Sequence, residues 1–256
     1  MNTVNIKHII EIAQQAGHIV LSIYNQASFD IQHKADQSAL TSADIESHAF
    51  ISSALERLYP SIPIISEEST QTYEYVERKN WDYFFLVDPL DGTKEFIQRN
   101  GEFTINIALI KKDQPILGVI HAPALGMTYH AEKDKGAYRI INNEQFKLPL
   151  NCKIDDQIRV VTSRSHCCSD TKKFIAELQV QGNQILETPA GSALKFGLIA
   201  EGNADIYPRF SPTMEWDTAA GHILINEIGK QAILVGNNEP LHYNKLDMKN
   251  SGFIVQ

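Results

Sequence analysis

The chain has 256 residues, and its 23 Lys and Arg residues against 31 Asp and Glu residues give a formal net charge of −8. Hydrophobic residues make up 43% and charged residues 21% of the chain, which is ordinary for a globular protein and excludes a disordered or fibrous one. The acidic balance argues against a partner that is a nucleic acid polymer, because such binders need surplus Lys and Arg to displace counterions. A small anionic ligand needs only a local positive site.

Cysteine and hydropathy patterns predict a cytoplasmic protein. The three cysteines Cys152, Cys167 and Cys168 cannot all pair and lack the CxxC spacing of a zinc site, so reduced thiols are expected. No apolar run approaches the roughly 18 residues of a membrane span. Polar residues such as Glu11 and Gln14 interrupt the N-terminal segment, which excludes a signal peptide. We therefore expect no integral membrane segment, and the oligomeric state is left open.

The first half of the chain predicts two helices followed by a sheet. Apolar residues recur at helical spacing from Ile6 to Ile23, and again over residues 42–59 ahead of Pro60. The expected strands cover residues 62–65, 81–87, 103–110, 116–121, 127–131 and 137–141. Because the links between most of them are too short for crossover helices, the sheet should be mainly antiparallel.

The second half alternates strands with helices. Strands are expected at residues 159–162, 184–187, 204–207 and 231–235, and helices at 170–178, 192–200 and 217–227. This alternation predicts a parallel or mixed sheet. A boundary near residue 150 would divide an α+β lobe, residues 1–149, from an α/β lobe, residues 150–256.

The run Asp88-Pro89-Leu90-Asp91-Gly92-Thr93 is the most informative stretch. Pro89 disfavours helix at Asp88, so the preceding strand should end there in a turn whose first and fourth residues lie within about 7 Å. Two carboxylates that close repel each other unless a cation lies between them. The aspartyl-phosphatase pattern DxDGT does not apply, because position 89 is Pro.

Two further acidic sites extend this pattern. Glu67 follows a short apolar strand, and Asp217 begins an expected helix, where it also fits an N-terminal capping role. Each acid alone has a plain structural explanation in a turn or a cap. Together with Asp88 and Asp91 they supply hard oxygen ligands, which indicates Mg²⁺ or Mn²⁺ rather than zinc.

Three segments, residues 66–68, 88–93 and 216–220, resemble the motifs of the inositol monophosphatase superfamily, a group of Mg²⁺-dependent, lithium-inhibited phosphatases. The likeness extends over nearly the whole chain. Within the superfamily, the chain most resembles the bacterial CysQ-type 3′(2′),5′-bisphosphate nucleotidases. That closer likeness rests on residues 88–97, 100–110, 163–166, 191–196 and 207–210.

The resemblance implies a layered αβαβα sandwich and removal of the 3′-phosphate of adenosine 3′,5′-bisphosphate, giving AMP and phosphate. One Mg²⁺ would be held by Glu67, Asp88 and the Leu90 carbonyl, and a second by Asp88, Asp91 and Asp217. A third Mg²⁺ near Glu67 and Asp44 is left open. The implied role is clearance of a nucleotide by-product of sulfate assimilation, and peripheral association with the inner face of the cytoplasmic membrane also stays open.

The chemistry of such a site gives further residues a role. A two-metal site clamps the attacking water and the leaving oxygen of a phosphate ester. Thr93 could hydrogen-bond that water, with Glu67 or Asp44 as the proton acceptor. The amides of Gly92 and Thr93, after Asp91, are expected to open a short helix and face the phosphate. Asp44 also fits a capping box, so capping alone could explain it.

Substrate specificity is assigned to the second half of the chain. A bisphosphate has a second phosphate that the metals do not hold, and Lys195 and Arg209 could bind it. Ser192 lies three residues before Lys195 and shares its helix face. His166 could touch the ribose or the base. From the residues alone, however, a polar loop histidine is the favoured explanation for His166 and a surface ion pair for Arg209. The substrate-binding set also includes residues of the metal site: Leu90, Asp91, Gly92, Thr93 and Asp217.

Two other functions remain as alternatives. A phosphatase for inositol phosphate or sugar bisphosphate would share the metal site and differ over residues 191–209. A non-catalytic nucleotide- or metal-binding sensor would keep only the fold, and the complete acidic set together with Thr93 argues against it. Preference among 3′-phosphate, 2′-phosphate and phosphosulfate nucleotides cannot be read from the sequence.

Overall fold

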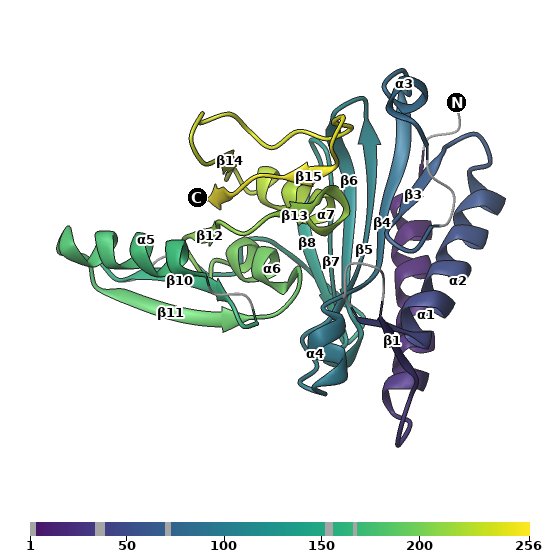
Figure 1. The fold of residues 1–256 in the computed structure, drawn as a ribbon, viewed down its shortest axis with the longest axis horizontal. Helices are drawn as coiled ribbons and strands as arrows, with labels where there is room; N and C mark the ends of the chain where they lie inside the picture. The colour runs from purple at the N-terminus through teal and green to yellow at the C-terminus, as the bar shows by residue number, and fades with distance from the viewer. Residues whose placement is uncertain (1–3, 34–38, 70–72, 152–155, 166–167) are drawn as a thin grey trace.

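A seven-stranded sheet forms the centre of the protein, in the order β3-β4-β5-β6-β7-β8-β9 (Figure 1). The computed structural model describes residues 4–33, 39–69, 73–151, 156–165 and 168–256. The strands are β3 (Ile64–Ser66), β4 (Tyr83–Asp91), β5 (Thr104–Lys111), β6 (Gln114–Ala122), β7 (Met127–Glu132), β8 (Gly136–Ile141) and β9 (Glu144–Lys147). Only the β3–β4 pair is parallel, which confirms the mainly antiparallel sheet.

Helices α1 (Ile6–Tyr24) and α2 (Ser42–Leu58) cover one face of this sheet. Along β4, Phe85 and Val87 pack against these helices, whereas Phe84 and Leu86 point into a second core on the opposite face. Successive side chains of a strand alternate between its two faces, and here both faces are buried. This explains why β4 reads as an unbroken apolar run rather than as an alternating one.

Helices α6 (Leu194–Glu201) and α7 (Glu215–Asn226) fill the second core. Glycines allow these helices to approach each other and the sheet closely. A Cβ on Gly118 of β6 would come within 2.7 Å of the Ala220 carbonyl oxygen in α7, and one on Gly221 would come within 2.3 Å of the Phe196 ring in α6. Helix α7 therefore sits directly on the sheet, with α6 directly against it.

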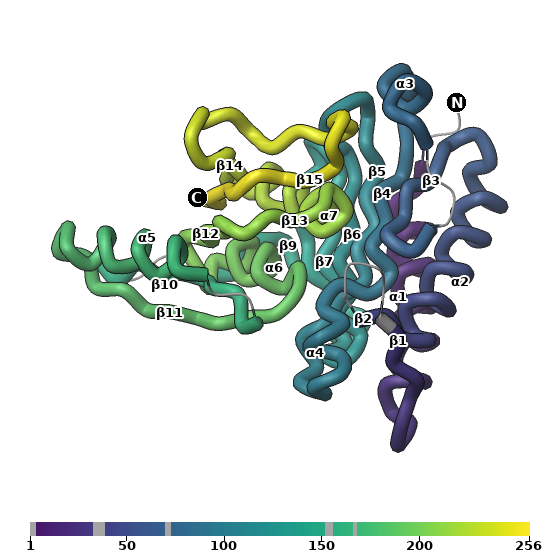
Figure 2. The backbone as a smooth tube through the Cα atoms, in the orientation of Figure 1, coloured from purple at the N-terminus to yellow at the C-terminus, as the bar shows by residue number. Residues whose placement is uncertain are grey.

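A smaller mixed sheet lies beyond these two helices, and α5 (Ser169–Val180) covers it, so the layers are α/β/α/β/α (Figures 1 and 2). Strands β10 (Ile158–Ser163) and β11 (Ile185–Ala190) are parallel. The antiparallel set β12 (Tyr207–Arg209), β16 (Phe253–Val255) and β14 (Ala232–Leu234) joins them through a parallel bridge from Val160 to Ile206. The predicted mixed sheet and the layered sandwich are confirmed.

Short elements complete the chain: β1 (Ile31–His33), β2 (Ala39–Thr41), α3 (Tyr75–Arg78), α4 (Thr93–Ile97), the 3-10 turn η1 (Pro123–Leu125), β13 (Thr213–Met214) and β15 (Lys249–Asn250). The division at residues 149/150 stays a prediction, because the core around α6 and α7 draws on both halves of the chain. Within the described residues, no helix combines the length and apolar character needed to cross a membrane.

The expected end of a strand at Asp88 is wrong. Strand β4 continues to Asp91, with a register shift against β5 between Asp88 and Asp91. Pairing with β3 ends at Val87, so Pro89 lies beyond the ladder, in the bulge. A bulge tolerates the missing N–H of proline and re-aims the neighbouring side chains. The two aspartates are thus set by a bulged strand end rather than by a free turn.

Candidate active site

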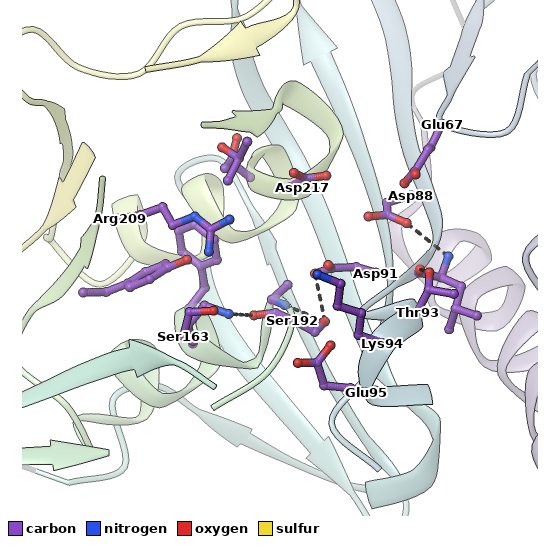
Figure 3. Close-up of a pocket in the computed structure, with 18 of the residues that line it drawn as sticks. Glu67, Asp88, Asp91, Thr93, Lys94, Glu95, Ser163, Ser192, Arg209 and Asp217 are labelled. Carbon is purple, nitrogen blue, oxygen red and sulfur yellow. Dashed lines mark hydrogen bonds between the residues drawn. The ribbon is translucent and has the colours of Figure 1, made fainter. Parts of the chain in front are cut away.

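A cavity of about 480 Å³ opens at the end of β4 and holds nearly all the predicted site residues. They enter from β3, β4, α4, α6, α7 and β12 (Figure 3). The predicted residues that line it are Glu67, Asp88, Leu90, Asp91, Gly92, Thr93, Ser192, Lys195, Arg209 and Asp217. Asp44 contacts Thr93 from behind, and His166 lies outside the described residues.

Glu67, Asp88 and Asp217 form a carboxylate cluster. Each offers one carboxylate oxygen, and these oxygens all lie within 4.8 Å of one another. Glu67 directly follows β3, Asp88 is at the bulge of β4, and Asp217 is in the first turn of α7, so three separate elements meet here (Figure 3). Within the described residues, this is the group of acids whose spacing would suit a metal ion.

Burial makes these charges expensive without a cation. It raises the pKa of Asp88 well above its ordinary value, and the charges of Glu67, Asp91 and Asp217 raise it further, against a hydrogen bond from the Leu90 amide at 3.1 Å. Burial and the charge of Asp91 likewise raise the pKa of Asp217. A cluster of carboxylate oxygens that repel one another at close range fits a hard divalent cation such as Mg²⁺.

Asp91 lies beside the cluster and is held by polar side chains. Its Oδ2 accepts hydrogen bonds from the Ser192 hydroxyl at 2.8 Å and from the Asn106 amide at 3.4 Å. Ser192 has a φ of 52°, and its Oγ also contacts the Thr104 hydroxyl. The loop before α6 is therefore tied to the acid side of the cavity. The expectation that Ser192 shares a helix face with Lys195 is wrong, because α6 begins only at Leu194 and the φ of Ser192 is not helical.

Thr93 and Asp44 form a hydrogen-bonded pair. Gly92 has a φ of 88°, a conformation that suits glycine, and it turns the chain from β4 into α4. Thr93 then places its Oγ1 to donate to Asp44 Oδ1 at 3.2 Å. The other Asp44 oxygen accepts from the Thr41 amide at 2.7 Å and the Thr41 hydroxyl at 2.6 Å. Asp44 thus caps α2, as the capping box predicts, and also contacts Thr93.

Lys195 and Arg209 are two cations that line the same cavity. Lys195 is 4% exposed, and burial lowers its pKa to about 8. Its Nζ donates to the Ser192 carbonyl at 2.5 Å and lies 5.6 Å from the centre of the Tyr207 ring. Arg209 points into the cavity from the side opposite the carboxylates (Figure 3), and its Nε donates to the Ser211 carbonyl at 3.2 Å. The cavity therefore has an acidic side and a basic side.

Sequence reasoning missed several residues that line the cavity. Glu95 and Lys94 lie in the first turn of α4, and Ser163 ends β10 (Figure 3). Glu95 carries a usable signal, since it stands two residues after Thr93 in the same short helix. The direction of its side chain depends on contacts with distant residues such as Ser165, and no local pattern reveals those.

The comparisons with known proteins agree with this geometry. The family model described as "Inositol monophosphatase family" matches residues 1–256. The chain belongs to the inositol monophosphatase family. It is 40% identical, over 255 residues, to the 3′(2′),5′-bisphosphate nucleotidase CysQ of Shigella flexneri, covering 96% of this chain and 97% of that protein.

Comparison with solved structures supports the family fold. The crystal structure of CysQ from Bacteroides thetaiotaomicron, a bacterial member of the inositol monophosphatase family, is 41% identical, with a TM-score of 0.88 over 98% of this chain and 96% of that one. An IMPase from Thermotoga maritima is 24% identical, with a TM-score of 0.78 over 98% of this chain and 91% of that one, and it supports the fold alone. The chain is therefore a member of a phosphatase family with the layered αβαβα architecture.

Proposed function

We propose that this chain is a Mg²⁺-dependent 3′(2′),5′-bisphosphate nucleotidase that converts adenosine 3′,5′-bisphosphate into AMP and phosphate. The observation that carries the proposal is one cavity that is lined both by the carboxylate cluster and by the cations Lys195 and Arg209. Such a site can hold one phosphate at metal ions and a second at the cations. The names of the relatives, which are about 40% identical, support the same substrate class.

The acids would hold the metal. Glu67, Asp88 and the Leu90 carbonyl are proposed to bind one Mg²⁺, and Asp88, Asp91 and Asp217 a second. Bound there, Mg²⁺ supplies charge neutralisation for the phosphate and lowers the pKa of a water molecule. A third ion at Glu67 and Asp44 would have to compete with the hydrogen bonds that both Asp44 oxygens already accept. We therefore take two ions as the working count.

Thr93 and Asp44 are proposed to accept the proton of the attacking water. In the pair, the Thr93 hydroxyl donates to Asp44, so its oxygen lone pairs are left to accept a hydrogen bond from an attacking water. Asp44 then receives the proton through Thr93 as the water reacts. The backbone N–H groups of Gly92 and Thr93 are proposed to bind the oxygens of the phosphate that is cleaved.

The second phosphate is proposed to bind at the basic side. Arg209 can offer two parallel hydrogen bonds to a phosphate, and Lys195 adds a charge close to Ser192. His166 keeps its predicted contact with the ribose or base as part of the proposal. We place the protein in the cytoplasm, in keeping with the free thiol of Cys168. A peripheral contact with the inner membrane face is a separate possibility that vesicle binding would test.

Phosphate release tests the proposal. Adenosine 3′,5′-bisphosphate, inositol 1-phosphate and fructose 1,6-bisphosphate are compared in Mg²⁺ and in EDTA. We expect fast release from the nucleotide only, lost in EDTA. Arg209→Ala should raise KM for the nucleotide about tenfold or more, whereas the exposed Arg57→Ala should leave it unchanged. Preference for either of the other substrates would overturn the substrate, and activity retained in EDTA would overturn the metal.

A further inference from the structure

Glu95 is a carboxylate in the cavity that the metal cluster does not use. It is 4% exposed and sits in the first turn of α4. Figure 3 shows its carboxylate directed into the cavity on the side away from Glu67 and Asp88, below Ser192. A carboxylate at that depth requires hydrogen-bond donors, because an unpaired buried charge is strongly disfavoured.

Only one oxygen of Glu95 has a partner in the described part of the chain. Oε1 accepts a hydrogen bond from the Ser165 hydroxyl. No donor among the described residues reaches Oε2. That oxygen lies against the loop that carries Thr93, since a Cβ built on Gly92 would come within 3.3 Å of it. Oε2 is thus next to the backbone where, in the proposed function, the cleaved phosphate binds.

Neither Lys195 nor Arg164 donates a hydrogen bond to this oxygen. Lys195 feels the charge of Glu95, but its Nζ donates to the carbonyls of Ser192 and Ala190. Arg164 is occupied by Glu102 through two hydrogen bonds of 2.6 Å each. Oε2 faces the cavity, so a ligand bound there can supply the donor that the described side chains do not. A phosphate dianion has no proton to give and would be repelled, so the ligand group is a hydroxyl or an amine.

Position selects between these two donors. Oε2 lies beside Gly92, close to the ester that is cleaved, and in a nucleoside bisphosphate the nearest donor to that ester is the neighbouring ribose hydroxyl. The base amine lies at the other end of the sugar. We propose that Glu95 is a specificity residue whose Oε2 accepts a hydrogen bond from the ribose hydroxyl adjacent to the cleaved phosphate. This inference rests on the proposed nucleotidase function.

Glu102 provides a matched control. Like Glu95, which contacts Ser165, Glu102 contacts the loops of the second half of the chain. It accepts hydrogen bonds from Arg164 and from the Gly191 amide at 2.7 Å. Its two oxygens are already used, and it does not line the cavity. Replacing Glu102 disturbs the loops around Ser165 and Ser192 without removing an acceptor from the cavity. Effects on loop structure and on substrate contact can therefore be separated.

The test compares adenosine 3′,5′-bisphosphate with its 2′-deoxy and 2′-O-methyl analogues. The deoxy analogue lacks the hydroxyl, and the methyl ether keeps the oxygen without its proton. We expect the wild-type protein to prefer the ribonucleotide by at least about tenfold in kcat/KM, which is about 1.4 kcal/mol. Glu95→Ala should reduce that preference to within about twofold by slowing the ribonucleotide. Glu102→Gln should lower all rates and keep the preference.

The outcomes separate the two proposals. If the wild-type protein does not cleave adenosine 3′,5′-bisphosphate, the nucleotidase function itself is wrong. If it cleaves all three nucleotides equally, or if Glu95→Ala keeps the ribonucleotide preference, Glu95 does not bind the hydroxyl. Should Glu95→Ala fail to fold, Glu95→Met, which removes the acceptor and keeps the length of the side chain, and the wild-type preference decide. An unchanged preference in Glu95→Met, or none in the wild type, overturns the inference.

Discussion

At the residue scale, the Thr93–Asp44 pair allows the proton-transfer role to be separated from structure. Thr93→Val keeps the shape of the side chain and removes the hydroxyl that donates to Asp44. We expect kcat to fall by about 10²- to 10⁴-fold with little change in KM, because a general-base path is lost and phosphate binding is kept. Thr93→Ser should retain most of the activity. Steady-state kinetics in saturating Mg²⁺ measure both.

The stability of these variants checks the interpretation. The cap of α2 uses the other oxygen of Asp44, so Thr93→Val should leave the melting temperature nearly unchanged. A loss of kcat that accompanies a large loss of stability would point to a structural role for Thr93. Equal activity in Thr93→Val and wild type would rule out the proton path through this hydroxyl.

The sequence predicted the acidic residues of the site better than it predicted the residues around them. The motifs around Asp88, Asp91 and Asp217 are contiguous runs, and the local rule for helix starts places Asp217 correctly. The local rule for proline ends the strand at Asp88, three residues before the end of β4. Glu95 could not be assigned in this way. Its role depends on Ser165 and on the Gly92 backbone, and contacts between distant segments have no local signature.

At the element scale, the bounds of the long periodic segments were predicted best, and some short strands were missed. Helices α1 and α2 and the long strands β5 to β7 follow their apolar periods closely. Strand β16, between β12 and β14 in the small sheet, was missed, and its pairing with both strands is entirely long-range. The bulge of β4 was missed for a related reason, since it depends on where β3 stops pairing.

The contact between α6 and α7 gives an element-scale prediction. Gly221→Ala in a solvated helix would stabilise by up to about 1 kcal/mol, because alanine favours helix. Here the added methyl would meet the Phe196 ring at 2.3 Å, and Phe196 is itself buried. We expect a net loss of about 1–3 kcal/mol in the free energy of unfolding, measured by urea denaturation. Exposed Ser53→Ala in α2 should gain a few tenths instead; a stabilised Gly221→Ala would mean that the two helices can separate.

The start of α7 depends on a buried ion pair. Glu215 is fully buried and accepts hydrogen bonds from the Asn244 and Lys245 amides and from Lys245 Nζ at 2.7 Å. Glu215→Ala should lower the free energy of unfolding by about 2–4 kcal/mol, because donors in a buried loop lose their partner. It should also raise the Mg²⁺ concentration for half-maximal activity, since Asp217 shares the first turn.

A surface ion pair serves as the comparison for that experiment. Lys135 is 64% exposed where it pairs with Glu132, so Lys135→Ala should change the free energy of unfolding by no more than about 0.5 kcal/mol. Unfolding curves and Mg²⁺ titrations of activity are measured for both variants. Normal Mg²⁺ dependence in a destabilised Glu215→Ala would show that Asp217 is held by its own contacts alone.

At the scale of the whole molecule, the repulsion among the acids of the site lowers the stability of the metal-free fold. The cluster joins β3, β4 and α7, so elements from both halves of the chain bring their charges together in one cavity. Without a cation, the repulsion among Glu67, Asp88 and Asp217 acts against this packing. With a cation, the same residues connect the central sheet to α7. Metal binding should therefore stabilise the entire molecule through linkage.

Asp217→Asn tests this conflict between function and stability. The variant keeps a carbonyl oxygen for the Met214 amide, which donates to Asp217 at 2.8 Å, and removes one charge from the cluster. Without metal at pH 7.5, we expect the free energy of unfolding of the variant to be about 1–2 kcal/mol higher than that of the wild type. In saturating Mg²⁺ the order should reverse, since about 2.7 kcal/mol is gained at 100 times Kd only by a protein that binds the ion.

The pH dependence of that difference follows from the raised pKa of Asp217. Between its ordinary pKa and its raised folded pKa, the folded wild type binds more protons than the unfolded chain, so its stability increases as the pH falls. The penalty is complete above the raised pKa and vanishes near pH 4. The advantage of Asp217→Asn without metal should therefore shrink from pH 7.5 toward pH 4.5. An advantage independent of pH would mean that repulsion within the cluster does not limit the stability of the metal-free protein.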